Sequence, residues 1–281
     1  QESALTRTSV KLGDQTFQLE LSSHSLRSPN FKLRLGQGGQ LVETPAPAPQ
    51  TYRGLVRSAD GTIILDAGAA MSIVGGRLSG IIDAKDGQTW MIQPAQDVDP
   101  VALEGAHVIY RAADMLPRAG KCGVAPGTPD IITPDRISAG PRGTGLKLAD
   151  IAIDCDFPYF QLNGSSVPNT LADVETVLNA INFVYERDVQ ITHVVTEIII
   201  RTTALDDPYT TNDPNTLLNQ FLFRWSTGVE EFISRDTAHL MTGRPTGGVI
   251  GIAYVSVICS STHAYGLSQT KWSPNFNDRV T

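Results

Sequence analysis

Short stretches in which hydrophobic and polar residues alternate run through the N-terminal part of the chain. Residues 17–21 (Phe-Gln-Leu-Glu-Leu) and 31–35 (Phe-Lys-Leu-Arg-Leu) follow a period of two, as expected of strands with one solvated face. Turn signals at Asp60-Gly61 and Asp86-Gly87 separate further apolar stretches. These stretches are residues 52–56, 62–65, 76–82, 88–94 and 107–111. We therefore expect residues 1–122 to form a β-rich domain that begins as a β-meander.

After residue 145 strands alternate with helices, which predicts an α/β layer structure. Strands are expected at residues 148–154, 191–201, 239–241 and 249–258. Asn169 or Thr170 is expected to cap a helix that runs to about Arg187, and Asp213-Pro214 to open a second helix. The apolar stripes of the two helices are Leu171, Val174, Val177, Leu178, Ile181 and Val184, and Leu217, Leu218, Phe221, Leu222 and Trp225. Residues 260–281 are expected to be irregular, with no terminal helix.

The two regions are joined by a segment that is too rich in proline and glycine for a helix or a strand. Residues 123–145 hold four prolines and five glycines and show no periodicity, which indicates a domain boundary. Arg136 and Arg142 lie within the segment. Proteases cut preferentially in exposed irregular backbone, so the segment is either a processing site or a plain linker whose arginines keep it soluble.

The composition disfavours some classes of binding partner, but it does not identify the cellular compartment. With 281 residues and 41% hydrophobic content, the chain can bury a sizeable core. The net charge of -7 disfavours nucleic acid or an anionic membrane surface as a partner, and no apolar run approaches the roughly 20 residues of a membrane span. Gln1 in the first position fits removal of a secretory signal, as it fits an arbitrary start. Composition alone is equally compatible with a secreted and a cytosolic protein.

Few side chains in the sequence form a pattern typical of a catalytic or metal-binding site. The chain contains no H-E-x-x-H, no G-x-S-x-G, no glycine-rich phosphate loop and no paired C-x-x-C. An odd number of cysteines leaves at least one free or paired outside this sequence, and these are Cys122, Cys155 and Cys259. Cys122 is expected in an exposed, basic, flexible turn, where a thiol is readily ionised and suits a metal ligand or a reactive group. The clustered acids Asp150, Asp154 and Asp156 fit calcium binding or a place beside a reaction centre, although a solvated strand end is the simpler explanation.

A longer motif spans residues 234–259. Residues 234–243 (Ser-Arg-Asp-Thr-Ala-His-Leu-Met-Thr-Gly) are followed by residues 248–255 (Gly-Val-Ile-Gly-Ile-Ala-Tyr-Val) and then by Cys259. This order resembles the reprolysin-type (adamalysin-like) metzincin metalloproteases, in which an Asp-x-Ala-x-Leu-Leu-Thr segment precedes a Gly-Leu-Ala edge strand that ends in a cysteine. Residues 147–156 resemble the first catalytic strand of that family.

The N-terminal region resembles the propeptide of the same family, which ends in a cysteine switch of the type Lys-x-Cys-Gly-Val. The matching residues are Lys121-Cys122-Gly123-Val124, in which Lys121 is directly adjacent to Cys122, a departure from the pattern. The resemblance implies a β-rich prodomain over residues 1–122 and a linker with a processing site over 123–145. Residues 146–281 would be the N-terminal part of an α/β metzincin-like catalytic subdomain, with a mixed, mostly parallel twisted sheet, an antiparallel edge strand and two long helices.

The function that the resemblance implies is the latent form of a secreted, zinc-dependent metalloendopeptidase, which hydrolyses peptide bonds by zinc-activated water. Cys122 would block the zinc, and Asp150 and Asp236 would be calcium ligands. An unpaired strand edge would bind protein or peptide substrates as an added strand, and its residues are Gly251, Ile252, Ala253 and Tyr254. An activating protease is the further partner that the resemblance implies.

The zinc motif of the family, H-E-x-x-H-x-x-G-x-x-H on a helix with the Glu as general base, is expected beyond Thr281. No catalytic residue is therefore assigned here, and we expect this chain to be inactive without the remaining catalytic segment. The resemblance pairs Cys259 with a cysteine downstream of the zinc helix, while a bridge between Cys155 and Cys259 is the alternative. A second hypothesis is a non-catalytic extracellular binding or structural module that lacks the zinc helix, and a third is a prodomain-like inhibitor that acts in trans.

Overall fold

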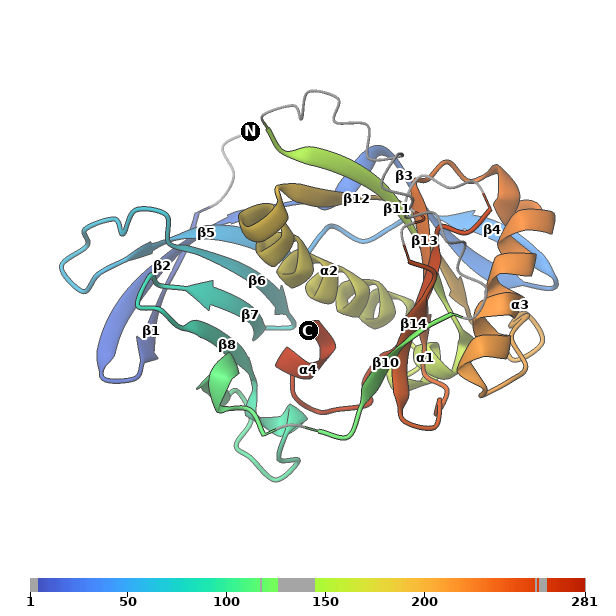
Figure 1. The fold of residues 1–281 in the computed structure, drawn as a ribbon. Coiled ribbons are helices and arrows are strands. Elements are labelled where there is room, and N and C mark those ends of the chain that lie inside the picture. The colour runs from blue at the N-terminus through green and yellow to red at the C-terminus, as the bar shows by residue number, and fades with distance from the viewer. Residues whose placement is uncertain (1–4, 117, 126–144, 256, 258–261, 281) are drawn as a thin grey trace, which may run out of the picture.

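The computed structural model describes residues 5–116, 118–125, 145–255, 257 and 262–280. These residues form two β-sheets, with seven strands in the first and eight in the second. The long helix α2 (Val167–Val189) lies between the two sheets, and α3 (Pro214–Thr227) covers the outer face of the second sheet (Figure 1). The molecule is therefore layered as sheet, helix, sheet and helix.

The first sheet is an antiparallel meander with the order β1-β2-β5-β6-β7-β8-β9. The bounds are β1 (Thr6–Leu12), β2 (Gln15–Ser23), β5 (Thr51–Arg57), β6 (Gly68–Val74), β7 (Arg77–Asp83), β8 (Thr89–Pro94) and β9 (His107–Arg111). The sheet curls until β1 approaches β9. The alternating residues of β2 place Phe17, Leu19 and Leu21 in its core. The predicted meander is confirmed for residues 17–21 but was wrong for residues 31–35, which lie in β3 (Arg27–Gln37) of the second sheet. The stretch expected at 62–65 does not form a full strand: Ile63 makes an isolated bridge with Arg57, and the Ile64 amide donates to the Val56 carbonyl at 3.0 Å.

The second sheet is mixed and mostly parallel, as predicted. Its order is β10-β14-β15-β13-β11-β12-β3-β4, and only the pairs β14/β15 and β3/β4 are antiparallel. The bounds are β10 (Lys121–Val124), β14 (Val249–Ala253), β15 (Tyr265–Gln269), β13 (Thr237–Thr242), β11 (Lys147–Cys155), β12 (Ile191–Arg201), β3 (Arg27–Gln37) and β4 (Gln40–Thr44). The antiparallel strand β14 is not at the edge, because β10 lies outside it.

Helix α2 packs on both sheets because apolar residues occupy two of its faces. Val174 and Leu178 join the core of the second sheet, while Val177 and Ala180 join a cluster with Ile81 and Met91 of the first. A polar contact adds to this packing, since the side-chain amide of Asn179 donates to the Met71 carbonyl of β6 at 3.0 Å. This double burial explains why the apolar stripe predicted for residues 171–184 is broad.

The helix ends follow capping chemistry. Ser166, and not Asn169 or Thr170, caps α2, and its hydroxyl accepts from the Asn169 amide at 3.4 Å. The predicted cap of α3 is confirmed, since the Asp213 carboxylate accepts from the Thr216 amide at 2.8 Å. The other helices among the described residues are α1 (Phe157–Leu162), α4 (Asn277–Val280) and the short 3-10 turns η1 (Ala95–Asp97), η2 (Ala112–Asp114) and η4 (Val229–Phe232).

Three expectations about local structure were wrong. The segment around Cys122 is not a flexible turn, because residues 121–124 form the short strand β10. The strand expected at 249–258 ends at Ala253. Residues 260–281 are not irregular throughout, since β15 lies between β13 and β14 and α4 follows it. Strand β15 pairs with β13 on one side and β14 on the other. These neighbours stabilise a strand that its own short sequence does not predict.

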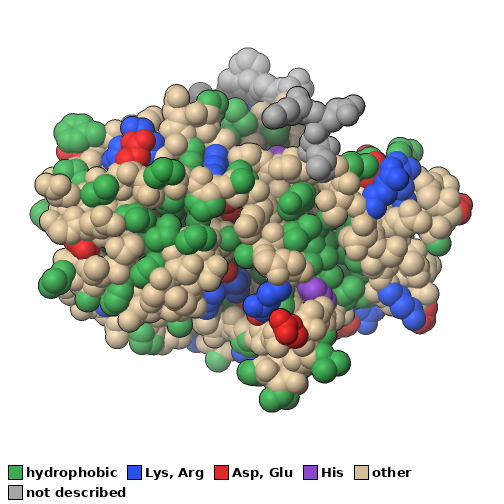
Figure 2. All heavy atoms as spheres, turned by 180° about the vertical axis from the view of Figure 1, so that it is seen from behind, with side chains coloured by type: hydrophobic (Ala, Val, Ile, Leu, Met, Phe, Trp, Pro, Cys, Tyr) green, Lys and Arg blue, Asp and Glu red, His purple; other side chains and the backbone are tan. Residues whose placement is uncertain are grey.

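The sheets do not follow the expected division of the chain. Strands β3 and β4 and the first two residues of β10 come from the region expected to be the prodomain, yet these strands belong to the second sheet. The division into 1–122, 123–145 and 146–281 stays a prediction, as does the processing site in the linker, of which residues 126–144 lie outside the described residues. None of the described helices combines the length and hydropathy needed to cross a membrane. On the face in Figure 2, acidic and basic side chains are interspersed among apolar ones.

Candidate functional site

The strand expected to bind substrate is already paired on both sides. Strand β14 lies antiparallel to β15 and parallel to β10. In the β10 ladder Cys122 lies opposite Gly251, Gly123 opposite Ile252 and Val124 opposite Ala253. The backbone bonds continue beyond the strand, because the amide of Ala125 donates to the Ala253 carbonyl at 3.0 Å. The edge predicted to be open is therefore covered by the Cys122 segment of the same chain.

The Cys122 thiol is exposed and makes no disulfide. A β-carbon built on Gly251 would lie 3.8 Å from the Cys122 sulfur, so the thiol lies close to the β14 backbone. Glycines on both sides of Cys122 allow this approach: a β-carbon at Gly120 would come within 2.8 Å of Ile250, and one at Gly123 within 3.4 Å of Val249. The small residues that the sequence shows around Cys122 thus bring β10 close to β14.

The four residues predicted to bind substrate differ in exposure. Ile252 points into the core with 5% of its surface exposed, while Gly251 and Ala253 are half-buried. Tyr254 follows the strand, and its hydroxyl donates to the Asn219 side chain of α3 at 2.9 Å. Burial raises the pKa of that hydroxyl. Gly251 and Ala253 therefore present backbone to the covering strand, while Ile252 and Tyr254 anchor β14 to the layer below.

The backbone before Cys122 reaches the last helix. Arg118 lies 3.5 Å from the carboxylate of Asp278 at the start of α4, and a β-carbon at Gly120 would lie 3.0 Å from the ring of Trp272. In Figure 1, β10 and the segment leading to α4 lie beside one another. The Cys122 segment therefore contacts two parts of the molecule, the β14 strand and the C-terminal segment.

Asp150 and Asp236, the proposed calcium ligands, lie next to each other. The Asp236 carboxylate accepts from the Asp150 amide at 2.9 Å, and the Asp236 amide donates to the Asp150 carbonyl at 2.8 Å. This reciprocal pair joins β11 to the segment that enters β13. Within the described part of the chain, no group of three or more His, Cys, Asp or Glu residues is arranged to hold a metal ion.

The two acids that follow Asp150 in the sequence, Asp154 and Asp156, lie in the interior of the protein. Asp154 and Asp156 are fully buried, so the expected solvated strand end was wrong. The Asp156 carboxylate accepts from the Tyr159 and Gly243 amides at 2.8 and 3.0 Å and caps α1. Burial raises the pKa of Asp156 to about 6 in spite of these hydrogen bonds.

Cys155 is the second thiol of the described part. It is a free cysteine with none of its surface exposed. Burial, together with the neighbouring Asp154 and Asp156, raises the pKa of the thiol, so the thiolate is disfavoured. The alternative bridge to Cys259 is therefore wrong for Cys155, while Cys259 itself lies outside the described residues.

The interior contains a network of buried ion pairs that the sequence pattern did not predict. Arg201 at the end of β12 donates to Asp154 at 3.0 and 2.7 Å and to Glu230 of η4 at 2.7 Å. Arg224 of α3 donates to the same Glu230 at 2.8 Å. Charged residues inside an apolar stretch are a sequence signal for such a network, but only the fold shows which of them meet. The network fixes α3 and η4 to the sheet.

Comparisons with known proteins bear on the C-terminal part. Residues 171–280 match the family model described as "Metallo-peptidase family M12B Reprolysin-like". This region extends from α2 to α4 and contains the β14 strand. No protein in the curated collection matches the chain in sequence. The matched region supports a metalloprotease-like function for this part of the chain.

Two solved structures show low similarity to the chain. One is the "Crystal Structure of metalloproteinase-II from Bacteroides fragilis", with 8% identity and a TM-score of 0.43 over 99% of this chain and 78% of the other. The second, "Structure of a chaperone-substrate complex", has 14% identity and a TM-score of 0.39 over 48% of this chain. The matched part spans only 24% of that second structure.

Proposed function

We propose that this chain is the latent part of a secreted zinc metalloendopeptidase, in which β10 is the inhibitory segment. The observation that carries the proposal is the ladder that places Cys122 opposite Gly251 on β14, inside the region that matches the reprolysin-like metallopeptidase family. A strand edge that binds extended peptides offers its backbone N–H and C=O groups. Here β10 uses those groups, so a peptide substrate has to displace β10.

The direction of β10 adds to this argument. Its pairing with β14 is parallel, whereas the other neighbour of β14 is antiparallel. Parallel and antiparallel ladders align the carbonyls along a strand differently. A substrate that added antiparallel to β14 would present its peptide bonds in the reverse order, so β10 can occupy the edge without being positioned as a substrate.

The described residues do not by themselves form a zinc site, since no three ligand side chains come together. Cys122 offers one thiolate, while zinc sites in proteins use about four ligands. The proposal therefore requires zinc ligands from residues other than those described here. Zinc, when bound, would supply the activated water for peptide hydrolysis, and the role we assign to this chain is to keep the Cys122 thiol and β10 over the β14 edge.

The test is cleavage of a casein-type substrate by the full-length protein, before any processing. Replacing Cys122→Ser removes the thiolate and keeps the shape, so we expect at least about a tenfold rise in activity, equivalent to about 1.4 kcal/mol of lost inhibition. Val124→Ala is the matched control, because Val124 is an exposed neighbour on the same strand. We expect it to leave latency unchanged.

Two results would contradict the proposal. Equal latency of the wild type and Cys122→Ser would remove the role of the thiol. A full-length protein that cleaves nothing after deletion of β10 alone (residues 121–124) would favour the non-catalytic module. Secretion, calcium at Asp150 and Asp236, and an activating protease that cuts in the linker of residues 123–145 belong to the same proposal.

A further inference from the structure

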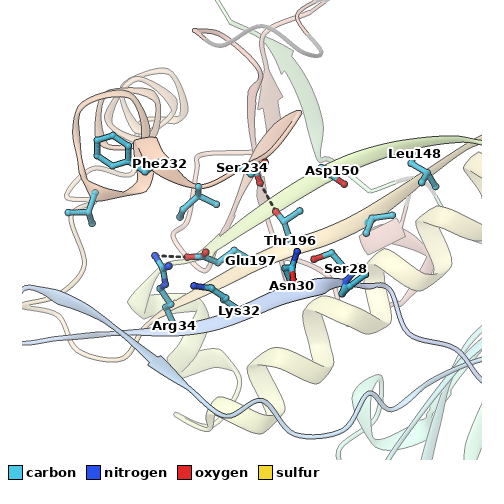
Figure 3. A pocket seen from close by; sticks show the side chains of 14 residues that line it. Ser28, Asn30, Lys32, Arg34, Leu148, Asp150, Thr196, Glu197, Phe232 and Ser234 are labelled. Carbon is cyan, nitrogen blue, oxygen red and sulfur yellow. Dashed lines mark hydrogen bonds and ion pairs between the residues drawn. The ribbon is translucent and has the colours of Figure 1, made fainter.

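A cavity of about 520 Å³ opens between β3, β11, β12 and η4 (Figure 3). It exists because the β3–β12 ladder and the β11–β12 ladder are both interrupted at the same place on β12, between Val195 and Glu197. The pairing of β3 with β12 jumps from Arg27 opposite Val195 to Lys32 opposite Glu197, which leaves residues 28–31 outside the ladder. On β12 the residue between the two partners is Thr196, whose hydroxyl donates to the Ser234 carbonyl at 2.9 Å. Paired irregularities of this kind redirect side chains.

Glu197 is the side chain redirected into this cavity. Only 5% of its side-chain surface is exposed, and its Oε1 lies 3.2 Å from Nη1 of Arg34 on β3. The geometry is poor for a hydrogen bond, and this oxygen has no hydrogen-bond donor among the described residues. In Figure 3 the Arg34 and Glu197 side chains face each other across the boundary between β3 and β12. An ionised carboxylate in this position is only partly compensated.

Charges on four elements surround this carboxyl group. Arg34 and Lys32 of β3 favour its ionised form, and Glu43 of β4 and Glu230 of η4 oppose it. Asp150 of β11 lines the same cavity. Burial outweighs the two cations and raises the pKa of Glu197 to about 7. The carboxyl group therefore changes charge near neutral pH while it is buried under β3.

We propose that the β3–β4 hairpin is a detachable strand cover on the outer edge of β12, and that it binds more tightly when Glu197 is protonated than when Glu197 is ionised. When the hairpin leaves, Glu197 becomes solvated and its charge costs little. The covered state thus binds a proton that the open state releases. This cover is separate from the β10 contact and does not depend on zinc.

The direction of the pH effect follows from linkage. The covered state has a raised pKa of about 7, against the ordinary value of 4.5 for an exposed glutamate. The stabilising contribution is therefore fully present below about pH 4.5 and is lost as the pH rises through about 7. Other contacts hold the hairpin throughout: Leu33 is buried with 1% exposed, and Arg27 donates to both oxygens of Glu175 on α2 at 2.5 and 3.1 Å.

The experiment is hydrogen exchange of the whole chain, read by mass spectrometry on peptides from β3 and β4. Rates measured at about pH 5.5 and about pH 8 are divided by the intrinsic rates of unstructured peptides, which gives the opening equilibrium at each pH. With pKa values of 4.5 and about 7, we expect opening to be up to about 25-fold more frequent at the higher pH. Peptides from β6 and β7 in the first sheet serve as the internal reference.

Two variants separate the proposed role from plain stability. Glu197→Gln removes the titrating group, so the ratio between the two pH values should fall to about one. Glu175→Gln is the matched control, a buried glutamate that also pairs with an arginine of β3 but has both oxygens hydrogen-bonded. It should increase opening at both pH values and keep the ratio.

A third variant keeps the test decisive if Glu197→Gln folds poorly. Arg34→Gln removes the nearest cation and should increase opening more at about pH 8 than at about pH 5.5, because only the ionised carboxylate loses its partner. Equal opening of β3 and β4 at the two pH values in the wild type would overturn the proposal. A pH ratio that survives Glu197→Gln, or one unchanged in Arg34→Gln, would overturn it as well.

Discussion

Asp154 lies at the centre of the buried ion network, and Asp154→Asn tests how much that network stabilises the fold. The carboxylate accepts two hydrogen bonds from Arg201, one from the Tyr209 hydroxyl at 2.7 Å and one from the Trp225 indole at 3.0 Å. Both Asp154 and Arg201 are buried, with 0% and 2% exposed. The replacement keeps the volume but removes the charge, and it places an NH₂ group among donors.

The expected loss follows from what remains around Arg201. Its guanidinium stays buried with Glu230 as its one remaining anionic partner among the described residues, at 2.7 Å. Removing one member of a buried ion pair typically costs about 3–5 kcal/mol, which is a large part of the roughly 5–15 kcal/mol that stabilises a domain. We expect Asp154→Asn to lower the free energy of unfolding by about 3–5 kcal/mol.

The assay is equilibrium unfolding in urea followed by tryptophan fluorescence, because the Trp225 ring lies within the network. Asp114→Asn is the control: it breaks a pair with Arg111 of similar length, 2.6 Å, in which both side chains are about half exposed, so the loss should be much smaller than that of Asp154→Asn. A loss below about 1 kcal/mol for Asp154→Asn would refute the reasoning. Adding Arg201→Met should recover part of the loss, since it removes the stranded charge.

Two further predictions concern packing and the thiols. A β-carbon at Gly243 would lie 2.5 Å from the carbonyl carbon of Pro158, so Gly243→Ala should destabilise the fold by about 1–3 kcal/mol in thermal unfolding. Gly123→Ala, whose new contacts would be 3.4 Å or longer, is the control, and equal melting temperatures of the two variants would contradict this. Iodoacetamide should label exposed Cys122 at least about 100-fold faster than buried Cys155. Peptide mapping measures both rates, and rapid labelling of Cys155 in the folded protein would count against its burial.

Elements with a strong local pattern could be predicted from the sequence. The strand predicted at 191–201 coincides with β12, and the Asp213-Pro214 start of α3 is confirmed. The start of α2 was missed by a few residues because Ser166 caps it and Pro168 fits the first turn. The sheet to which β3 belongs could not be predicted, because Leu33 pairs with Ile198 and nothing in a local pattern specifies a partner so distant in the chain.

In the candidate sites, too, local features could be predicted from the sequence, while features that depend on strand pairing could not. The exposed thiol of Cys122 was predicted, but its strand was not, since β10 is only four residues long and contains a glycine. Glu197 was not singled out, although an acid within the apolar run of residues 194–200 was the available signal for a buried charge. Its importance depends on the jump in register beside it, which is a property of the assembled sheet.

Strand pairing in the second sheet joins the N-terminal part of the chain to the C-terminal part. Strands β14, β15, β13, β11 and β12 form a continuous block, and strands from before residue 126 cover both of its edges, β10 on one side and β3–β4 on the other. In the protease proposal, loss of the thiol at Cys122 leaves both ladders and the Arg118–Asp278 contact in place. Cys122→Ser should therefore release less activity than deletion of β10 (residues 121–124). A cut in the linker alone should leave the two parts associated, because a severed loop removes a covalent tether and none of the strand pairing.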